Sequence, residues 1–444
     1  MSEVLQIKEF DAITCEADDR IEYGKYRLNR QNFDDLMTFV REYTSDEEQA
    51  DALEFMKIGY KRNAGDIISF NNYVGMIQLP SGMQIEILPK IDLGDGDIDD
   101  LRTKKVFLKM LRTMKDFEGK VFSDANLNVD RMNLYEIFIN MYLQEVRQLV
   151  KKGIKSAYVG QEDNLNYFKG KLLVNNHIRT NLVHKERFFV AYDEFHPNRP
   201  ENKLIKSTLL KLQKLTKSSE NSREIYRLLT FFEMADVSTN YEKDFSKVVI
   251  DRNTKDYALL MQWSKIFLMN QSFTTFSGQQ DSKAILFPME SVYESFVARQ
   301  LKKTMVPRGW EVSTQDKGYY LFEEPKRQFA LRPDIVLHDG DRCVVLDTKW
   351  KALIDNPRCN YGISQGDMYQ MYAYSKKYMT SEIWLLYPMT KEFREHKDIW
   401  FGSDQNGILP TNVKLFFIDL ADDRSIEKLG DVLCAREPIR VEEE

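Results

Sequence analysis

The sequence predicts a multidomain α+β protein with a β-rich N-terminal part, a helical middle and a C-terminal α/β domain on a mixed central sheet. Three patterns lead to this prediction. Short apolar stretches broken by turn residues dominate the first part, helical spacing of apolar residues dominates the middle, and strands alternate with helices in the last third. The length of 444 residues suits two or three domains of about 150 residues. We therefore predict domains at residues 1–100, 101–284 and 285–444.

The β-rich prediction for the N-terminal part is based on residues 67–91. Short apolar stretches alternate there with turn signals at Asn71-Asn72 and Ser81-Gly82. The acidic loop at 92–100 follows and marks a plausible domain boundary.

The middle of the chain shows helical periodicity, most clearly in residues 130–152. Apolar residues recur there at helical spacing, and Lys151-Lys152-Gly153 supplies the cations and glycine that end helices. Similar patterns predict helices at residues 101–115, 204–215, 223–234 and 257–269.

The last third changes character after a helix predicted at 288–303. Strands are expected at 310–312, 319–322, 332–337, 343–349, 383–387 and 413–418, with a helix at 365–378. This alternation indicates an α/β domain with a mixed sheet.

Composition excludes several classes of protein. Lys plus Arg is 63 and Asp plus Glu is 69, and a net charge of −6 argues against coating nucleic acid by bulk charge, although it permits a local basic channel. The four cysteines are scattered and form no CxxC pair, so neither a zinc finger nor a disulfide scaffold is expected. The sequence shows no signal peptide and no long apolar run, which predicts a cytoplasmic protein without a membrane span.

Residues 332–351 carry the strongest chemical signal. Asp339-Gly340 between two β-rich runs predicts a hairpin, and pairing His338 with Asp341 would make Asp334 and Asp347 diagonal neighbours about 7–8 Å apart. Because side chains two apart on a strand share a face, Asp334, Asp347 and Lys349 would project from the same side.

Two carboxylates and an ammonium on one face of an apolar strand pair suggest a metal site. Buried charge is costly unless it is paired or binds metal, and hard carboxylate oxygens suit Mg²⁺. Lys349 could hold or deprotonate an attacking water, or stabilise a pentavalent phosphate. The alternative is an Asp–Lys ion pair at a sheet edge.

Asp334, Asp347 and Lys349 resemble the PD-(D/E)xK phosphodiesterase motif, here PD, twelve residues and DTK. The resemblance implies that Asp334 and Asp347 bind Mg²⁺, or Mn²⁺ in its place. It also implies that the Thr348 carbonyl completes the site and that Lys349 is catalytic. Members of this superfamily often add a Glu from the preceding helix, for which Glu294 is the preferred candidate here, with a solvated acidic flank as the alternative.

Gln370 and Tyr374 lie four residues apart, on one face of the predicted helix at 365–378. They resemble the Q-x-x-x-Y element found beside the active site in many nucleases of this superfamily. A buried Tyr with a surface Gln explains the same pattern without any catalytic role.

The chain further resembles the McrC family, the nuclease subunits of McrBC-type modification-dependent restriction systems. Four blocks carry the resemblance, at residues 168–181, 195–212, 344–351 and 364–374. It implies a hexameric, GTP-hydrolysing McrB-like AAA+ partner that reads the methylated cytosine, an N-terminal part that inserts into the motor ring and stimulates GTP hydrolysis, and a C-terminal part that cuts double-stranded DNA. The sequence contains no G-x-x-x-x-G-K-[ST], so this chain is not expected to bind a nucleotide itself.

Arg179, in the first of these blocks, is the residue that we would test for motor activation. Lysine- and arginine-rich stretches at 102–115 and 203–217 could contact DNA phosphates or a partner, or form solvated helix faces. Two other functions stay open from the sequence. One is a stand-alone repair exonuclease with the same core, and the other is a non-catalytic adaptor that only activates or scaffolds the motor.

Overall fold

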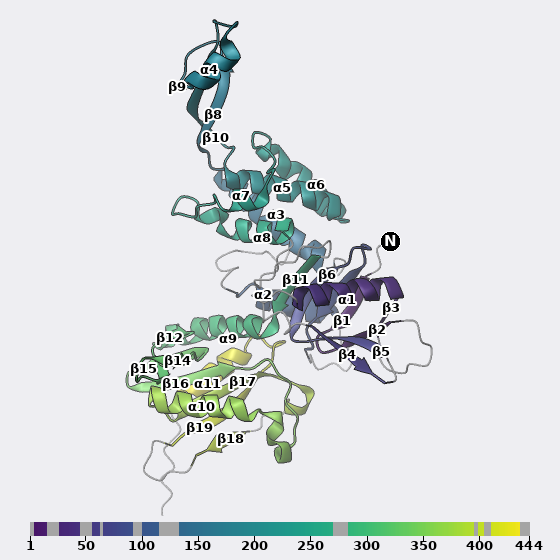
Figure 1. Ribbon diagram of the computed structural model, residues 1–444. Helices are drawn as coiled ribbons and strands as arrows, with labels where there is room; N and C mark the ends of the chain where they lie inside the picture. The colour runs from purple at the N-terminus through teal and green to yellow at the C-terminus, as the bar shows by residue number, and fades with distance from the viewer. Residues whose placement is uncertain are drawn as a thin grey trace, which may run out of the picture.

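The computed structural model describes residues 4–15, 26–44, 56–62, 65–91, 100–114, 133–269, 283–394, 398–403 and 410–435. The loop predicted as a boundary after residue 91 therefore lies almost wholly outside the described residues, as does Lys115 of the first basic stretch. A slender arm extends from one end of the molecule, above a bundle of helices, and the C-terminal α/β part forms the opposite end (Figure 1). The N-terminal strands lie beside the junction between these two parts (Figure 1).

The N-terminal part contains two four-stranded sheets. One has the order β3-β2-β5-β4 and the other the order β1-β7-β6-β11. Helix α1 (Arg30–Thr44) packs with the first sheet. The strands are β1 (Val4–Lys8), β2 (Ala12–Cys15), β3 (Tyr26–Leu28), β4 (Met56–Lys61), β5 (Gly65–Phe70), β6 (Tyr73–Gln78), β7 (Gln84–Leu88) and β11 (Lys283–Pro288).

Strand β11 joins this N-terminal sheet from far along the sequence. It pairs antiparallel with β6, where Gly75 faces Leu286. Gly75 has φ +144°, and a Cβ there would lie 2.0 Å from the Ile285 carbonyl oxygen, so only glycine permits this close approach. The predicted boundary between residues 284 and 285 falls inside β11, and the division into three domains stays a prediction.

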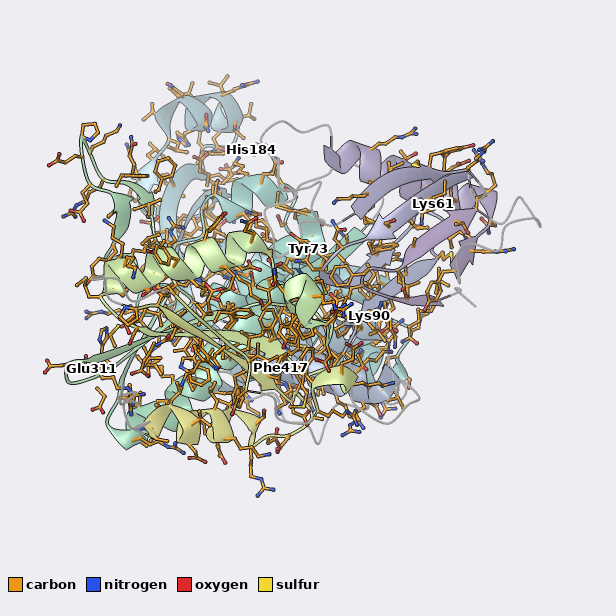
Figure 2. The ribbon with its side chains drawn as sticks, turned by 90° about the horizontal axis from the view of Figure 1, so that it is seen from below. Lys61, Tyr73, Lys90, His184, Glu311 and Phe417 are labelled. Carbon is orange, nitrogen blue, oxygen red and sulfur yellow. The ribbon has the colours of Figure 1, made fainter. Side chains whose placement is uncertain are left out.

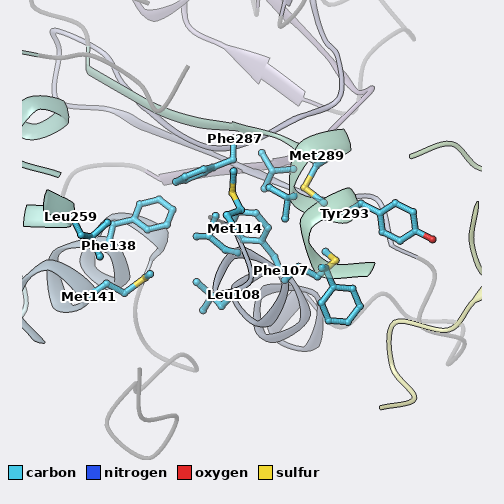
Figure 3. Close-up of a cluster of buried hydrophobic side chains, with 14 of the residues drawn as sticks. Phe107, Leu108, Met114, Phe138, Met141, Leu259, Phe287, Met289 and Tyr293 are labelled. Atoms are coloured by element: carbon cyan, nitrogen blue, oxygen red, sulfur yellow. The ribbon is translucent and has the colours of Figure 1, made fainter. Parts of the chain in front are cut away.

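The middle part is a helical bundle. Helix α3 begins at Leu134 because the Asn133 side chain caps it by accepting from the Glu136 amide, and it ends at Gly153, which has φ +86°. Phe287 of β11 packs between Phe138 of α3 and Phe107 of α2, with ring centroids 5.5 and 6.1 Å apart (Figure 3). The helices are α2 (Asp100–Leu111), α3 (Leu134–Lys152), α5 (Pro200–Leu215), α6 (Ser219–Leu229), α7 (Tyr241–Phe245) and α8 (Ala258–Met269).

The middle part also contains an arm that the helical prediction did not include. Strands β8 (Ala157–Leu165) and β10 (Phe188–His196) pair antiparallel along their whole length. The short strand β9 (Lys171–Leu172) and helix α4 (Val174–Asn181) cover the far end. The arm projects away from the helical bundle (Figure 1).

The C-terminal part has a six-stranded sheet of order β12-β15-β16-β17-β19-β18. Strands β16, β17 and β19 are parallel, while β12, β15 and β18 run antiparallel to their neighbours, so the predicted mixed sheet is confirmed. The strands are β12 (Glu311–Thr314), β15 (Ile335–Asp339), β16 (Arg342–Thr348), β17 (Glu382–Pro388), β18 (Trp400–Gly402) and β19 (Asn412–Ile418). A separate hairpin is formed by β13 (Tyr320–Phe322) and β14 (Gln328–Ala330).

Helices cover both faces of this sheet. Alternate residues of β16 point in opposite directions, so Val344 and Leu346 join the core around α9 (Met289–Met305), and Val345 joins the core around α10 (Gln365–Tyr378). Helix α11 (Ser425–Cys434) packs beside α9. Helix α10 links the parallel strands β16 and β17, and its first turns therefore come close to the end of β16.

Short 3-10 segments complete the described structure. They occupy Thr230–Phe232, Lys255–Tyr257, Val306–Arg308, Pro357–Gly362 and Lys391–Phe393. Within the described ranges, no helix combines the length and apolar character needed to cross a membrane.

Candidate active site

The β15–β16 hairpin brings Asp334 and Asp347 face to face. Asp339 pairs with Arg342 and Ile335 pairs with Leu346, so the next step of the ladder places Asp334 opposite Asp347. The predicted register was wrong by two residues. The turn consists of Gly340-Asp341, because Gly340 supplies the positive φ of +59° that the first loop position favours. A shift of two residues preserves the face of each side chain, so the two aspartates still project together.

Asp334 is held by the end of the neighbouring strand. The Thr348 amide and hydroxyl both donate to its Oδ2, at 2.7 and 2.6 Å. Its own carbonyl accepts from the Gln315 amide at 3.0 Å. Burial raises the pKa of Asp334, while the Thr348 donors and Lys349 oppose that rise. These contacts fix one carboxylate oxygen and leave Oδ1 for other ligands.

Asp347 lies deeper, with only 2% of the residue exposed. Its Oδ2 lies 2.8 Å from Lys349 Nζ, and apart from this ammonium it has no hydrogen-bond partner among the described residues. Burial, and then the adjacent charge of Asp334, raises the pKa of Asp347 to about 7. Two buried carboxylates side by side repel each other when ionised, so the pair favours either a proton or a bound cation.

Lys349 supplies the local cation. Its Nζ lies 2.8 Å from Asp347 and 3.6 Å from Asp367, and it donates to Gln370 Oε1 at 3.1 Å. Burial lowers the pKa of Lys349, but the neighbouring carboxylates, Asp347 first, raise it by more. Lys349 is therefore charged at neutral pH, which suits it to stabilise negative charge and to orient a water rather than to remove a proton.

The predicted Gln370–Tyr374 pair continues the network from Lys349. Gln370 Nε2 donates to the Tyr374 hydroxyl at 2.7 Å, so Lys349, Gln370 and Tyr374 form one chain of hydrogen bonds. Tyr374 is buried in the core between α10 and the sheet. Asp367 was not among the predicted site residues. Its spacing of three residues from Gln370 on one helical face was the signal that it also points at Lys349.

Glu294 lies on α9, the helix that covers the other face of the sheet. Its carboxylate accepts a hydrogen bond from the Gln315 side chain, and the backbone N–H of Gln315 donates to the Asp334 carbonyl. Glu294 is thus linked to Asp334 through one residue. Its role as a metal ligand stays a prediction.

Arg179 lies apart from these residues, on α4 at the far end of the arm (Figure 1).

The two basic stretches, at 102–115 and 203–217, are partly engaged in contacts within the protein. Lys104 forms a buried ion pair with Glu86 at 2.9 Å, and Lys109 pairs with Asp423. Lys211 donates to the Leu268 carbonyl. The buried Lys104 is therefore a poor candidate for contact with DNA, whereas Lys109, whose partner Asp423 is exposed, keeps part of its side chain at the surface.

The family described as "McrBC 5-methylcytosine restriction system component" matches residues 68–388, which is well over half of the chain. The match includes every residue of the site from Glu294 to Tyr374, and also Arg179. The chain belongs to the McrBC family.

Two solved structures are similar to this McrBC-family chain, and the first of them shares its fold. A chain of the refined half-complex from a tetradecameric assembly of Thermococcus gammatolerans McrB AAA+ hexamers with bound McrC is 18% identical, with a TM-score of 0.66 over 97% of this chain and 100% of that chain. A chain of the cryo-EM structure of the Thermococcus gammatolerans McrBC complex is also 18% identical, with a TM-score of 0.47 over 68% of this chain and 88% of that chain. No curated protein matches.

The residues present fit a hard divalent cation such as Mg²⁺. Asp334 and Asp347 supply carboxylate oxygens, and the buried Asp347 Oδ2 has only the ammonium as a partner. No cluster of three or more His, Cys, Asp or Glu that could hold a metal occurs in the part of the chain that the structure describes. A site with two carboxylates and several retained waters is typical of Mg²⁺, which gives up its waters reluctantly.

Replacing Asp347 by Asn should stabilise the metal-free protein at high pH. The raised pKa means that the folded chain binds more protons than the unfolded chain between about pH 4 and pH 7, so stability falls as pH rises through that window. Because asparagine carries no charge, the variant should not lose folding stability in this way as the pH rises. From pH 5 to pH 8 the gain over the wild type should grow by about 2–3 kcal/mol, which corresponds to roughly 5–10 °C in Tm for a domain of this size.

Thermal unfolding in the presence of a chelator measures this effect. Asp341→Asn is the matched control because Asp341 is exposed at the turn of the same hairpin. A gain for Asp347→Asn that did not change with pH would contradict the assignment of a raised pKa.

Replacing Gln370 by Leu should weaken the positioning of Lys349. The leucine occupies a similar volume but removes the acceptor for the Lys349 ammonium. Misplacing a catalytic group costs up to about a hundredfold in rate, so we expect a loss of about ten- to a hundredfold in the DNA cleavage proposed below. Tyr374→Phe, which leaves Gln370 in place, should lose less. Equal rates for Gln370→Leu and wild type at saturating DNA would exclude this role.

Proposed function

We propose that this chain is the DNA endonuclease subunit of a two-component, GTP-driven restriction complex that acts on methylated DNA. The C-terminal part is, in this proposal, a PD-(D/E)xK nuclease that hydrolyses phosphodiester bonds with Mg²⁺. The observation that carries the proposal is the convergence of Asp334, Asp347 and Lys349 at one end of a mixed sheet, in a chain of the McrBC family.

Each residue of the site has a distinct role in this mechanism. Asp334, fixed by Thr348, and Asp347 would hold the cation, with the Thr348 carbonyl as a further ligand. When bound, Mg²⁺ supplies a water of lowered pKa and neutralises charge on the phosphate. Lys349 carries its charge beside the scissile phosphate and stabilises the negative charge that develops there. Gln370 and Tyr374 keep the ammonium in place.

The arm, at the opposite end of the molecule from the C-terminal part, has the features of a surface that binds another protein. Large apolar side chains that monomeric proteins normally cover are exposed along it, which is typical of a protein-binding surface. These are Tyr158, Tyr167, Phe168, Val174, Ile178, Leu182, Val183 and Phe195. We propose that the arm binds a McrB-like AAA+ hexamer, because the structural neighbour with the same fold comes from a complex described as McrB AAA+ hexamers with bound McrC.

Arg179 is well placed to act on that motor. It is exposed on α4, and no ion pair engages it among the described residues. We propose that it contacts the motor and stimulates GTP hydrolysis. The chain encodes no phosphate-binding P-loop, so the nucleotide is bound by the partner.

Reconstitution tests the proposal as a whole. The chain is purified together with its McrB-like AAA+ partner. GTP hydrolysis and cleavage of methylated DNA are then measured with Mg²⁺. Cleavage that requires both the motor and GTP is the expected result. Degradation of DNA ends by the chain alone would favour a repair exonuclease. Stimulated GTP hydrolysis without any cleavage would favour an adaptor.

A further inference from the structure

A buried carboxylate from the N-terminal part bonds to Trp350, which lies just after the end of strand β16. Glu9, in the turn after β1, has no exposed surface. Both of its oxygens lie 3.0 Å from the Trp350 indole nitrogen, and Oε1 also accepts from the Lys90 amide at 2.7 Å. Lys90 lies on the inner side of the N-terminal strands, whereas Lys61 lies toward their outer side (Figure 2).

Trp350 follows Lys349 directly and is anchored on the other side of the sheet. Its ring packs against Tyr293 of α9, with centroids 5.3 Å apart, and it belongs to the core on the α9 face. Lys349 meanwhile points toward Gln370 and Asp367 of α10. Lys349 therefore projects from the α10 face of the sheet, while the next residue, Trp350, is anchored on the α9 face.

Strand β16 ends at Thr348, just before Lys349. The Lys349 amide still donates to the Leu386 carbonyl of β17, and the Lys349 carbonyl accepts from the Lys351 amide at 3.0 Å. Of these two bonds only the first reaches another element, so the Trp350 side chain adds a second long-range anchor to the segment from which Lys349 projects. An indole ring fixed by packing and by an N–H bond has little freedom to rotate.

Burial of Glu9 is costly. It raises the pKa of Glu9 to about 7, against the opposing effects of the Lys90 and Trp350 N–H groups. A buried carboxylate adds little net stability compared with apolar packing, and its best-attested use is to specify one arrangement. Here the arrangement that it specifies is the orientation of the Trp350 ring.

We propose that Glu9 and Trp350 form a positioning pair through which the N-terminal β-rich part holds Lys349 in its catalytic place. The proposal rests on the nuclease function proposed above and deepens it. Neither residue touches the reacting atoms. Their effect reaches the reaction through the backbone of residues 349–350, and it gives the first hundred residues a role in cleavage.

Three variants test the pair in the full complex with its motor. Trp350→Phe keeps the ring against Tyr293 and removes the N–H, Glu9→Leu removes the acceptor, and the third variant combines both. Each single change should lower the cleavage rate at saturating DNA by about tenfold or more, with unchanged affinity for DNA and motor. The double variant should be no slower than the slower single one, because both remove the same bond. Glu9→Gln keeps Oε1 as an acceptor and should recover most of the rate.

Glu86→Gln is the matched control. Glu86 is another buried carboxylate of the same sheet, but its partners are Lys104, Gln6 and the Leu134 amide, away from the catalytic strand. This variant should lose thermal stability and keep a cleavage rate within about twofold of wild type. An equal loss of cleavage in Glu86→Gln and Glu9→Leu would show a general packing effect and overturn the proposal.

Hydrogen exchange of the peptide that spans residues 344–352 provides a readout independent of cleavage. The Lys349 amide should exchange at least tenfold faster in Trp350→Phe and Glu9→Leu, and at the wild-type rate in Glu86→Gln. Unchanged exchange in Trp350→Phe would overturn the pair, even if Glu9→Leu proved too unstable to measure. A wild-type complex that failed to cut DNA would refute the nuclease function, while the exchange measurement would still decide the coupling.

Discussion

Replacing Asp347 by Asn should abolish DNA cleavage by the reconstituted complex and leave stimulation of the motor intact. Asparagine keeps the size of the side chain but removes one of the two carboxylates that would hold the cation. A bound metal contributes several kcal/mol to stabilising the transition state, so we expect a loss of at least about a thousandfold, or about 4 kcal/mol. GTP hydrolysis should not change, because strand β16, which carries Asp347, lies at the opposite end of the molecule from the arm (Figure 1).

The experiment measures single-turnover cleavage of methylated DNA beside GTP hydrolysis in the same sample. Asp341→Asn, exposed at the turn of the same hairpin, should retain the wild-type cleavage rate. Removal of divalent cations should stop cleavage by the wild type, and Mg²⁺ or Mn²⁺ should restore it. An intact Asp347→Asn complex that cut DNA at the wild-type rate would refute this active site.

Removing the arm should abolish stimulation of the motor while the rest of the chain stays folded. Gly160 pairs with Asp193, so replacing residues 161–192 by Asn-Gly joins the two strands through a two-residue turn. Within 161–192, where every residue is described, Val190 is the only buried hydrophobic side chain. The excision therefore costs the core little, and Tm should stay within about 2 °C of wild type.

A graded variant locates the effect within the arm. Arg179→Ala should lower the stimulated GTP hydrolysis by the motor by about tenfold, the effect of losing one central arginine contact at an interface. Arg223→Ala is the matched control, since Arg223 is an exposed arginine on α6 of the helical bundle. Full stimulation by the chain that lacks the arm would contradict its proposed role. If Arg223→Ala also lost stimulation of GTP hydrolysis, the surface that contacts the motor would extend beyond the arm to the helical bundle.

Helices with strong local signals could be predicted well from the sequence. The helix predicted at 365–378 is α10 as observed, because the Ser364 hydroxyl caps its first turn and the apolar spacing continues to its end. Helix α1 was missed although Phe33, Leu36 and Val40 follow helical spacing. The arm was missed because its strands bury almost no apolar face, so they lack the alternation that identifies a half-buried strand.

The candidate site was predictable as far as local geometry determines it. Asp334, Asp347 and Lys349 were placed on one face because strand alternation follows from sequence spacing alone. The register could not be fixed, since Asp339-Gly340 and Gly340-Asp341 are both acceptable turns. The choice between them depends on how the hairpin packs between α9 and α10.

The sequence by itself determined the residue types, their order and the faces on which they lie. Those properties depend on backbone periodicity and on turn chemistry, which act over a few residues. Only the tertiary structure decided that Asp367 approaches Lys349, that Glu294 is linked to Asp334 through Gln315, and that Glu9 bonds to Trp350 across 341 positions. Such contacts depend on how whole layers pack against each other, and a buried polar group selects its partner only once that packing has excluded water.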